Sequence, residues 1–319
     1  MPKKTQASNS ARARKSTSRR VPAASGARSS TSERKRKSPA PRVAKAAGQG
    51  TRRKAKKARL TAATADRHVL YQKSVQDAAV EIDFIDRTFK KLRKRPPLSL
   101  REDFCGTGLL TTAWVASDAK RTGIGVDIDP EVLAWGKKHN LEPLGEEGAR
   151  VSLRKQDVRT PPTEKVDVVV AFNFSYWIFM TREEMRKYFA LVRKSLKKDG
   201  VYFLDAYGGW ESHQPMQEPR SIRGGFKYVW DQATFDPITH RAENHIHFRF
   251  PDGTEMEKAF SYTWRFWSLP EIQELLQEAG FSKVQVYWDT SEDENEENYK
   301  PVKHADNHPG WLAYIVAQP

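Results

Sequence analysis

The chain has 319 residues and a net charge of +15, but the charge is concentrated at one end. Residues 1–64 contain 20 Lys and Arg against the single acid Glu33, a charge of +19, so the rest of the chain carries −4. The same segment has no Phe, Trp or Tyr, and it cannot bury enough apolar surface to offset the entropy of ordering. We therefore predict a disordered basic tail over residues 1–64, followed by a globular domain.

Composition also excludes several classes of protein. Cys105 is the only cysteine, so an intrachain disulfide or a cysteine-rich metal site is impossible and a reducing compartment is expected. The sequence has no run of eighteen apolar residues, and the basic N-terminus lacks the apolar core of a signal peptide. We expect a soluble protein of the cytoplasm, or of the nucleus if the source is eukaryotic.

The next region predicts helices and then a regular alternation of strands and helices. Apolar residues at helical spacing predict a helix over residues 74–95, which Pro96 and Pro97 end. From Leu98 onward, short apolar runs alternate with amphipathic segments, a pattern that predicts a parallel sheet with helices on both faces. The expected strands are 98–104, 122–127, 151–153, 166–172 and 201–206, with helices that begin at Leu109, Pro130 and Thr181. Thr181 and Glu184 have the spacing of a capping box.

Residues 208–267 break this alternation and favour antiparallel strands. The stretches 226–230, 245–250 and 260–266 read as strands, and Asp252–Gly253 suits a hairpin turn between the second and third. Ser268 then caps a helix that Gly280 ends, and residues 284–288 and 311–316 predict two closing strands. The predicted fold class is therefore α/β, a Rossmann-like sheet of seven mostly parallel strands with an antiparallel insertion at about 208–267.

Three loops of this sheet carry candidate binding residues. The first predicted strand ends in Cys105-Gly106-Thr107-Gly108, and its small residues let a ligand approach the backbone at a helix N-terminus. Asp127 lies at the tip of the second strand, where a carboxylate can accept ribose hydroxyls. Asp157-Val158 follows the third strand, with a polar and an apolar side chain for an adenine. In open α/β sheets these loops share the ligand-binding edge.

This motif set resembles, in the same order, that of the class I S-adenosylmethionine-dependent methyltransferases over roughly residues 98–319. The resemblance implies a Rossmann-like methyltransferase domain with S-adenosylmethionine as cofactor and residues 65–97 as a helical lid. The family pattern is acid-x-Gly-x-Gly-x-Gly, so Glu102 matches the acid and Gly106 and Gly108 match two of the glycines. Phe104 stands in place of the first glycine, where we expect the site geometry to differ most.

The resemblance also implies roles for individual residues. Asp127 would bind the ribose, Ile128 would pack on the adenine, and Asp157 with Val158 would hold the adenine edge. Asn173 and Phe174 would border the methyl group, Asp103 could share the polar role of Glu102, and Cys105 would pack beneath the cofactor. The cofactor-binding candidates are Glu102, Asp103, Cys105, Gly106, Thr107, Gly108, Asp127, Ile128, Asp157, Val158, Asn173, Phe174 and the lid residue Tyr71.

The sequence constrains the methyl acceptor less than it constrains the cofactor. Tyr176, Tyr207 and Trp210 are candidates for a substrate pocket, although core packing explains such aromatics equally well. The insertion is similar to the acceptor-covering segment of methyltransferases of small metabolites, which favours a small-molecule acceptor. Asn173-Phe174-Ser175-Tyr176 partly matches the Asn-Pro-Pro-Tyr motif of adenine-amino and glutamine methyltransferases, so a nitrogen acceptor is an alternative. No residue is predicted to act as a catalytic base.

Other interpretations stay open. A dinucleotide-dependent dehydrogenase would need a longer glycine pattern than the one that stops at Gly108. The basic tail could bind nucleic acid through its phosphates, and it favours a methyltransferase of nucleic acid or basic protein, or an inactive nucleic-acid-binding protein. It could equally be a nuclear address or a solubilising arm. His245 and His247 alternate on one strand, but without a third ligand we predict no metal site.

Overall fold

The computed structural model of the protein describes residues 60–291 and 297–319. The predicted disordered tail lies outside these ranges, apart from residues 60–64. Within those five residues, Leu60 and Ala62 pack against the apolar side chains of a small sheet, and the Ala62 amide donates a hydrogen bond to Thr254. Residues 60–64 are therefore part of the folded domain, where the sequence analysis assigned them to the tail.

The described residues contain one large mixed sheet of eight strands in the order β11-β10-β12-β5-β4-β1-β2-β3. Its strands are β1 (Ser99–Asp103), β2 (Thr122–Asp127), β3 (Val151–Lys155), β4 (Val166–Ala171), β5 (Leu196–Gly208), β10 (Lys283–Asp289), β11 (Tyr299–Val302) and β12 (Trp311–Gln318). Strands β1 to β5 run parallel, and β12 pairs antiparallel with β5. The parallel strands consequently end at one common edge, as predicted for a Rossmann-like sheet.

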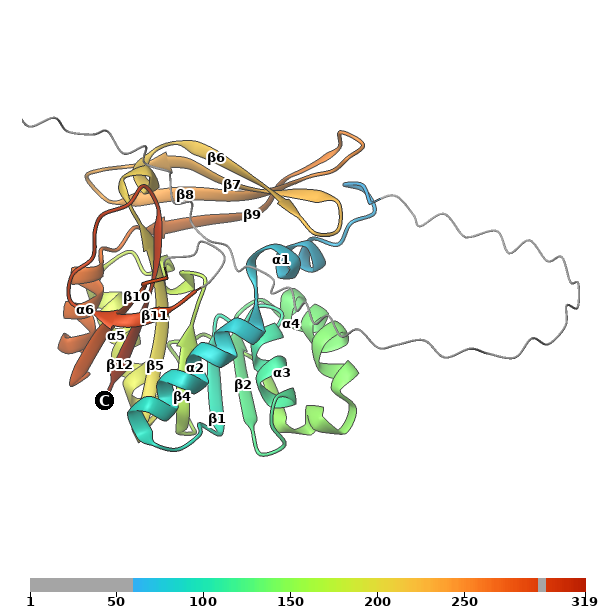
Figure 1. Cartoon of the computed structure of the whole chain (residues 1–319). Coiled ribbons are helices and arrows are strands. Elements are labelled where there is room, and N and C mark those ends of the chain that lie inside the picture. Colours follow the sequence, from blue (N-terminus) through green and yellow to red (C-terminus); the bar gives the residue numbers. More distant parts are fainter. Residues whose placement is uncertain (1–59, 292–296) are drawn as a thin grey trace, which may run out of the picture.

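Helices cover both faces of this sheet (Figure 1). The helices are α1 (Arg67–Val75), α2 (Ala78–Arg93), α3 (Leu109–Ala116), α4 (Pro130–Gly136), α5 (Arg182–Ser195) and α6 (Leu269–Glu278). Side chains of α2 and α3 share a buried cluster with Val168 and Phe203, whereas those of α5 and α6 share another with Val169 and Leu204. Because neighbouring residues of a strand point to opposite faces, the two clusters lie on the two sides of the sheet.

A second sheet lies across the carboxyl edge of the parallel strands, above α1 in Figure 1. It is antiparallel in the order β6-β7-β8-β9, with β6 (Met216–Ile222), β7 (Phe226–Phe235), β8 (Arg241–Arg249) and β9 (Glu255–Arg265). The hairpin turn expected at Asp252–Gly253 joins β8 to β9, where the Phe250 amide bonds to the Thr254 carbonyl. This small sheet is the predicted insertion, and it brings a layer of aromatic side chains over the edge of the main sheet.

The remaining elements are short helical turns that connect the strands. They are η1 (Lys137–Leu141), η2 (Glu142–Arg150), η3 (Ser175–Ile178) and η4 (Trp210–His213). Turn η3 follows the loop after β4 and contacts β9, so it lies where the two sheets meet.

The fold class is confirmed, with differences in the number of strands and helices. The main sheet has eight strands instead of seven, because the short β11 pairs with β10. The small sheet has a fourth strand, β6, which was not predicted and which pairs with β7. Each added strand contains a proline and lacks an alternating apolar pattern, so pairing with a neighbour decides its conformation. The helix predicted over residues 74–95 is α2 alone, because Asp77 caps it and separates it from α1.

Candidate functional site

The predicted glycine turn connects β1 to α3 at the carboxyl edge of the sheet. Its backbone is fixed by two hydrogen bonds, from the Cys105 amide to the Val126 carbonyl and from the Gly108 amide to the Cys105 carbonyl. Gly106 has a positive φ of 53°, and a Cβ atom at this position would have no neighbour within 4 Å. The space above Gly106 is therefore open, and the main chain is accessible to a bound molecule.

Phe104 replaces a family glycine, and it takes the conformation that glycine favours. Its φ is +58°, a left-handed conformation that costs a residue with a side chain about 1–2 kcal/mol. The Phe104 ring lies 5.8 Å from the Tyr188 ring and 6.1 Å from the Phe179 ring, centroid to centroid. The backbone thus keeps the course of a glycine turn, while the side chain packs into the α5 face of the sheet.

Glu102, the predicted acidic residue of the motif, is buried and bound to the helix that follows the turn. Its Oε2 atom accepts hydrogen bonds from the Thr111 amide, at 2.9 Å, and from the Thr111 hydroxyl. Burial raises the pKa of Glu102 to about 7, although both bonds from Thr111 act in the opposite direction. Glu102 consequently holds the N-terminus of α3 against β1 and shapes the turn from below.

Asp103 does not share the role of Glu102. It points to the opposite face of the sheet, where Arg101 donates to one carboxylate oxygen at 2.6 Å and the Tyr188 hydroxyl to the other at 2.9 Å. All three side chains are buried. The structure therefore places Asp103 in a structural network of the interior, because successive strand residues alternate between faces.

Asp127 and Ile128 lie beside the glycine turn, as predicted. The Asp127 carboxylate accepts a 2.7 Å hydrogen bond from the Gly106 amide and a 3.0 Å bond from the Asp129 amide. Ile128 is 66% exposed, an unusual position for a large apolar side chain. The sheet thus brings a fixed carboxylate and an uncovered apolar surface next to the open space above Gly106.

Cys105, Thr107 and Gly108 complete the turn. The Cys105 thiol is buried, and a Cβ atom added at Gly125 would come within 2.9 Å of its sulfur. A Cβ at Gly108 would meet Leu153 at 2.7 Å, and one at Gly136 would meet the Thr107 carbonyl at 2.1 Å. The turn is therefore packed tightly from below and from the side of α4, which leaves its upper surface for contacts with other groups.

The loop after β3 differs from its expected role. Both oxygens of the Asp157 carboxylate are engaged by the Arg159 guanidinium, and Val158 is buried in the core. The hydrogen bonds from Arg159 lower the pKa of Asp157. Val158 is consequently unavailable as a surface for adenine in this conformation, whereas Asp157 lies at the surface of the same loop.

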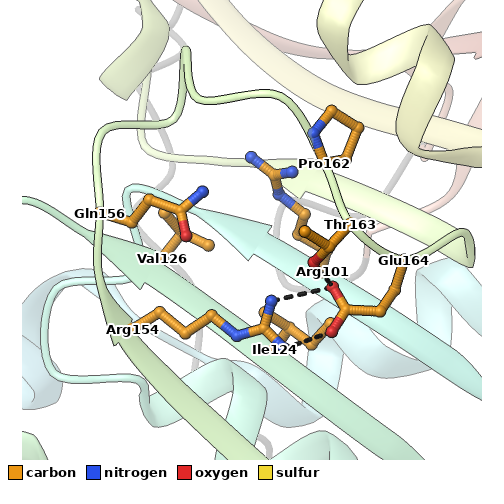
Figure 2. A pocket seen from close by; sticks show the side chains of 8 residues that line it. All are labelled: Arg101, Ile124, Val126, Arg154, Gln156, Pro162, Thr163 and Glu164. Atoms are coloured by element: carbon orange, nitrogen blue, oxygen red, sulfur yellow. Dashed lines mark hydrogen bonds and ion pairs between the residues drawn. The ribbon is translucent and has the colours of Figure 1, made fainter.

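A small hollow lies under this loop, between β1, β2 and β3 (Figure 2). Arg154 and Glu164 form a two-point ion pair across it, with distances of 2.7 and 2.9 Å, and this pair lowers the pKa of Glu164 to about 2. Arg101 also lines the hollow, and Arg101 and Glu102 point to opposite faces of β1. The hollow therefore lies on the other face of β1 from Glu102.

The loop after β4 contains Asn173 and Phe174 in an unusual backbone conformation. Both residues have a φ of +58°, and their amides donate to the two oxygens of the Asp205 carboxylate at 2.8 and 2.9 Å. Burial raises the pKa of Asp205 to about 7, against the effect of the two amide bonds. Asp205, on β5, thus holds this loop in its left-handed conformation at the carboxyl edge.

The segment before α2 covers the glycine turn. The Gln72 side chain of α1 donates to the Thr107 hydroxyl at 2.8 Å, and the Trp135 indole donates to Asp66 at 2.7 Å. The Tyr71 ring packs 4.9 Å from the ring of Phe260 on β9, and burial raises the pKa of its hydroxyl to about 12. Helix α1 is therefore attached to the glycine turn, to α4 and to the small sheet.

The three aromatic candidates for the acceptor pocket have different positions. Tyr176 is completely buried, and its hydroxyl donates to the Asp205 carbonyl, so it belongs to the core. Trp210 is 52% exposed on η4. Tyr207 lies between the two sheets, 4.7 Å from the Phe174 ring and 6.3 Å from the Trp230 ring, centroid to centroid. Only Tyr207 of the three lies in the layer that joins the loop after β4 to the small sheet.

Sequence analysis missed two residues of this site, Gln72 and Asp205. Asp205 interrupts the apolar run of β5, and an acid inside a buried strand is a signal that could have identified it. Gln72 has no such signal, because polar residues are common on a surface helix. Among the described residues, no group of three His, Cys, Asp or Glu side chains is placed to hold a metal ion.

The sequence of the carboxyl-edge loops matches a known family. Residues 104–200 match the profile of a family described as a methyltransferase domain. Residues 104–200 are therefore similar to a methyltransferase domain. The match includes the glycine turn, Asp127 and the loop after β4. No curated protein is similar enough in sequence to count as a relative.

Solved methyltransferase structures have the same fold over most of the chain. A S-adenosylmethionine-dependent methyltransferase from Clostridium acetobutylicum has a TM-score of 0.59 at 18% identity, covering 79% of this chain and 97% of its own. An amino pentose methyltransferase from Micromonospora echinaspora has a TM-score of 0.56 at 16% identity, covering 79% and 96%. A sugar N-methyltransferase from a Streptoalloteichus species has a TM-score of 0.53 at 15% identity, covering 86% and 99%.

The family match and the shared fold confirm the main expectations from the sequence. The match over residues 104–200 supports a methyltransferase domain, and most of the chain has the fold of S-adenosylmethionine-dependent methyltransferases. None of the described helices is both long and apolar enough to cross a membrane. A nucleic-acid partner remains a prediction, because the basic segment on which it rests lies outside the described residues apart from Leu60–Thr64.

Proposed function

We propose that the methyltransferase domain transfers a methyl group to a small-molecule acceptor held between the small sheet and the carboxyl edge of the main sheet. The observation that carries this proposal is that α1 and the small sheet cover the edge where the glycine turn, Asp127 and Asn173 gather. A site covered in this way suits a small acceptor better than a segment of duplex or of folded protein. The acceptors named for two proteins of the same fold, an amino pentose and a sugar nitrogen, support a small polar amine.

Residues of the glycine turn and of the neighbouring loops would hold the cofactor. The Asp127 carboxylate, oriented by the Gly106 and Asp129 amides, would accept hydrogen bonds from the ribose hydroxyls. The exposed Ile128 would pack on the adenine. The open backbone at Gly106 and the Thr107 hydroxyl would approach the remainder of the cofactor, with Tyr71 and Gln72 above them.

The protein would contribute orientation and exclusion of water. S-adenosylmethionine supplies the methyl group on a positively charged sulfur, and transfer is an in-line displacement by the acceptor. Asp205 holds Asn173 and Phe174 beside this position, so the loop would not need to reorganise during the reaction. The ionised carboxylates of Asp205 and Glu102 would also stabilise the positive charge of the bound cofactor.

Cofactor affinity provides the first test of this assignment. Asp127→Ala should weaken S-adenosylmethionine binding by about tenfold or more, because it removes charged hydrogen-bond acceptors from the ribose. Isothermal titration calorimetry of the purified protein measures this effect. Asp157→Ala is a matched control, since its carboxylate is engaged by Arg159, and it should change the affinity less. An Asp127→Ala protein that binds as tightly as the wild type would contradict the placement of the ribose.

A further inference from the structure

Two polar side chains between the sheets are buried without a hydrogen-bond partner. The hydroxyl of Tyr207 and the amide nitrogen of Asn244 have no partner atom within hydrogen-bond geometry, and each residue is only 2% exposed. A buried polar group that makes no hydrogen bond loses its hydration without replacement, so most buried polar groups in native proteins have a partner. Such groups are typical of sites where a ligand supplies the missing partner.

The two groups face the same region. Asn244 pairs with Tyr262 across β8 and β9 and with Gln232 across β7 and β8, so these three side chains share one face of the small sheet. Tyr207 lies near the end of β5 below that face, and a side-chain hydrogen bond with Asn244, short of good hydrogen-bond geometry, lowers the pKa of its hydroxyl. Gln232, by contrast, donates to the Glu211 and Gln214 carbonyls. Tyr207, Asn244 and the Trp177 indole nitrogen therefore lack partners in this layer, whereas their polar neighbour Gln232 is satisfied.

The surroundings of this pair are aromatic and uncharged. The Tyr207 ring stacks 5.0 Å from the Trp177 ring and lies close to the rings of Phe174 and Trp230. Burial raises the pKa of the Tyr207 hydroxyl, and no charged side chain contributes to that shift. A carboxylate bound here would be desolvated without a counter-charge, whereas a hydroxyl or carbonyl oxygen would not carry this penalty.

The pair also lies next to the proposed methyl-transfer position. Phe174, which contacts the Tyr207 ring at 4.7 Å, follows Asn173 in the loop that Asp205 holds. A small molecule that reaches from this loop to the small sheet would bring its own polar atoms to Tyr207 and Asn244.

We propose that the Tyr207 hydroxyl and the Asn244 amide donate hydrogen bonds to one uncharged oxygen, a hydroxyl or a carbonyl, of the methyl acceptor. This pair determines specificity by selecting acceptors that carry such an oxygen at a fixed distance from the methylated atom. The inference rests on the proposed transfer to a small molecule and adds the chemical class of the acceptor.

The stability of the ligand-free protein tests whether the Tyr207 hydroxyl lacks a hydrogen-bond partner. Tyr207→Phe removes only the hydroxyl, so the urea midpoint of the ligand-free protein should stay unchanged or rise. Tyr188→Phe is the matched control, because its hydroxyl donates to Asp103, and its midpoint should fall. If the urea midpoint of Tyr207→Phe falls as much as that of Tyr188→Phe, the Tyr207 hydroxyl has a structural partner, and the inference is overturned.

Methyl transfer tests the role in specificity. Labelled S-adenosylmethionine is supplied with glucosamine or with cyclohexylamine, two six-membered-ring amines of which only the first carries hydroxyls. The wild type should favour glucosamine, and Tyr207→Phe and Asn244→Leu should each reduce that preference by roughly tenfold, with cofactor affinity unchanged by calorimetry. An unchanged preference in both variants would overturn the inference, whereas a wild type that binds no S-adenosylmethionine would contradict the proposed function itself.

Discussion

Phe104 shows how a side chain can be accommodated where a glycine is usual. The residue accepts a φ of +58°, and its ring packs between Tyr188 and Phe179 on the α5 face. The aromatic contacts help to offset the cost of the left-handed backbone, because a fully buried ring contributes about 1.5–3 kcal/mol and the Phe104 ring is partly buried. The turn therefore retains its course although the motif is irregular.

Substitutions at Phe104 can separate the two effects. Phe104→Ala loses the ring and keeps a strained backbone, whereas Phe104→Gly loses the ring and relieves the strain. We expect both variants to be less stable than the wild type, with Phe104→Gly more stable than Phe104→Ala by about 1 kcal/mol. Urea denaturation followed by circular dichroism measures the difference. An alanine variant at least as stable as the glycine variant would contradict a strained backbone at this position.

Glu102 and Asp103 show what a motif cannot reveal at the scale of single residues. Both are acids at the end of β1, and the sequence analysis assigned both to the cofactor. In the fold they face opposite sides, so Glu102 binds the N-terminus of α3 and Asp103 binds Arg101 and Tyr188. Successive side chains of a strand face opposite sides of the sheet, and this alternation separates Glu102 from Asp103. It could be used only once the structure showed that β1 extends through both residues.

At the scale of elements, α1 is attached to the glycine turn and to α4 by few polar contacts, while Leu70 and Tyr71 pack on the small sheet. Single side-chain bonds, from Gln72 to Thr107 and from Trp135 to Asp66, attach it to the glycine turn and to α4. Helices held by few contacts open at low free-energy cost, which suits a segment that must admit and release a cofactor. The lid role predicted for residues 65–97 thus stays a prediction, and α1 is its structural candidate.

Removal of the bond between Gln72 and Thr107 tests this role. Gln72→Ala should raise the dissociation rate of S-adenosylmethionine several-fold, since a hydrogen bond of this kind contributes about 0.5–1.5 kcal/mol to the closed state. Stopped-flow measurement of cofactor release would report the rate. Lys73→Ala, an exposed change on the same helix, serves as the control and should leave the rate unaltered. Equal rates in the wild type and Gln72→Ala would argue against a lid.

The starts of α5 and α6 were predictable from sequence. Thr181 and Ser268 cap α5 and α6 through capping boxes with Glu184 and Glu271. These signals are local, because a cap depends on residues three positions apart. Strands β6 and β11 were not predicted, since their conformation depends on pairing with residues distant in the fold.

At the scale of the whole molecule, buried carboxylates couple cofactor binding to pH. Burial raises the pKa of Glu102 and of Asp205 to about 7, so in the ligand-free protein both lose their protons near neutral pH. Because the folded protein binds these protons more tightly than the unfolded chain, each protonated carboxyl group stabilises the fold. This contribution is fully present below the pKa of the unfolded chain, near 4, and is lost as the pH rises through the folded pKa of about 7. The ligand-free protein should therefore lose stability between about pH 4 and 7 through these two groups.

The cofactor should reverse that trend, because its positive charge favours the ionised carboxylates. We expect the dissociation constant of S-adenosylmethionine to fall as the pH rises from 6 to 8. S-adenosylhomocysteine, whose sulfur is uncharged, is the matched control and should show a smaller change. Calorimetric titrations at several pH values compare the two ligands. Parallel pH profiles for both would exclude the proposed coupling to the sulfonium charge.

The sequence by itself determined the fold class, the glycine turn, Asp127 and the position of the insertion, because these depend on local periodicity and on residues close together in the chain. Tertiary structure alone decided that Asp103 lies in the interior and that Asp205 holds the loop at Asn173. It also decided that Tyr207 and Asn244 are buried without partners. Those outcomes depend on side chains that the fold brings together from distant strands. A local sequence pattern does not show which of these side chains point toward one another.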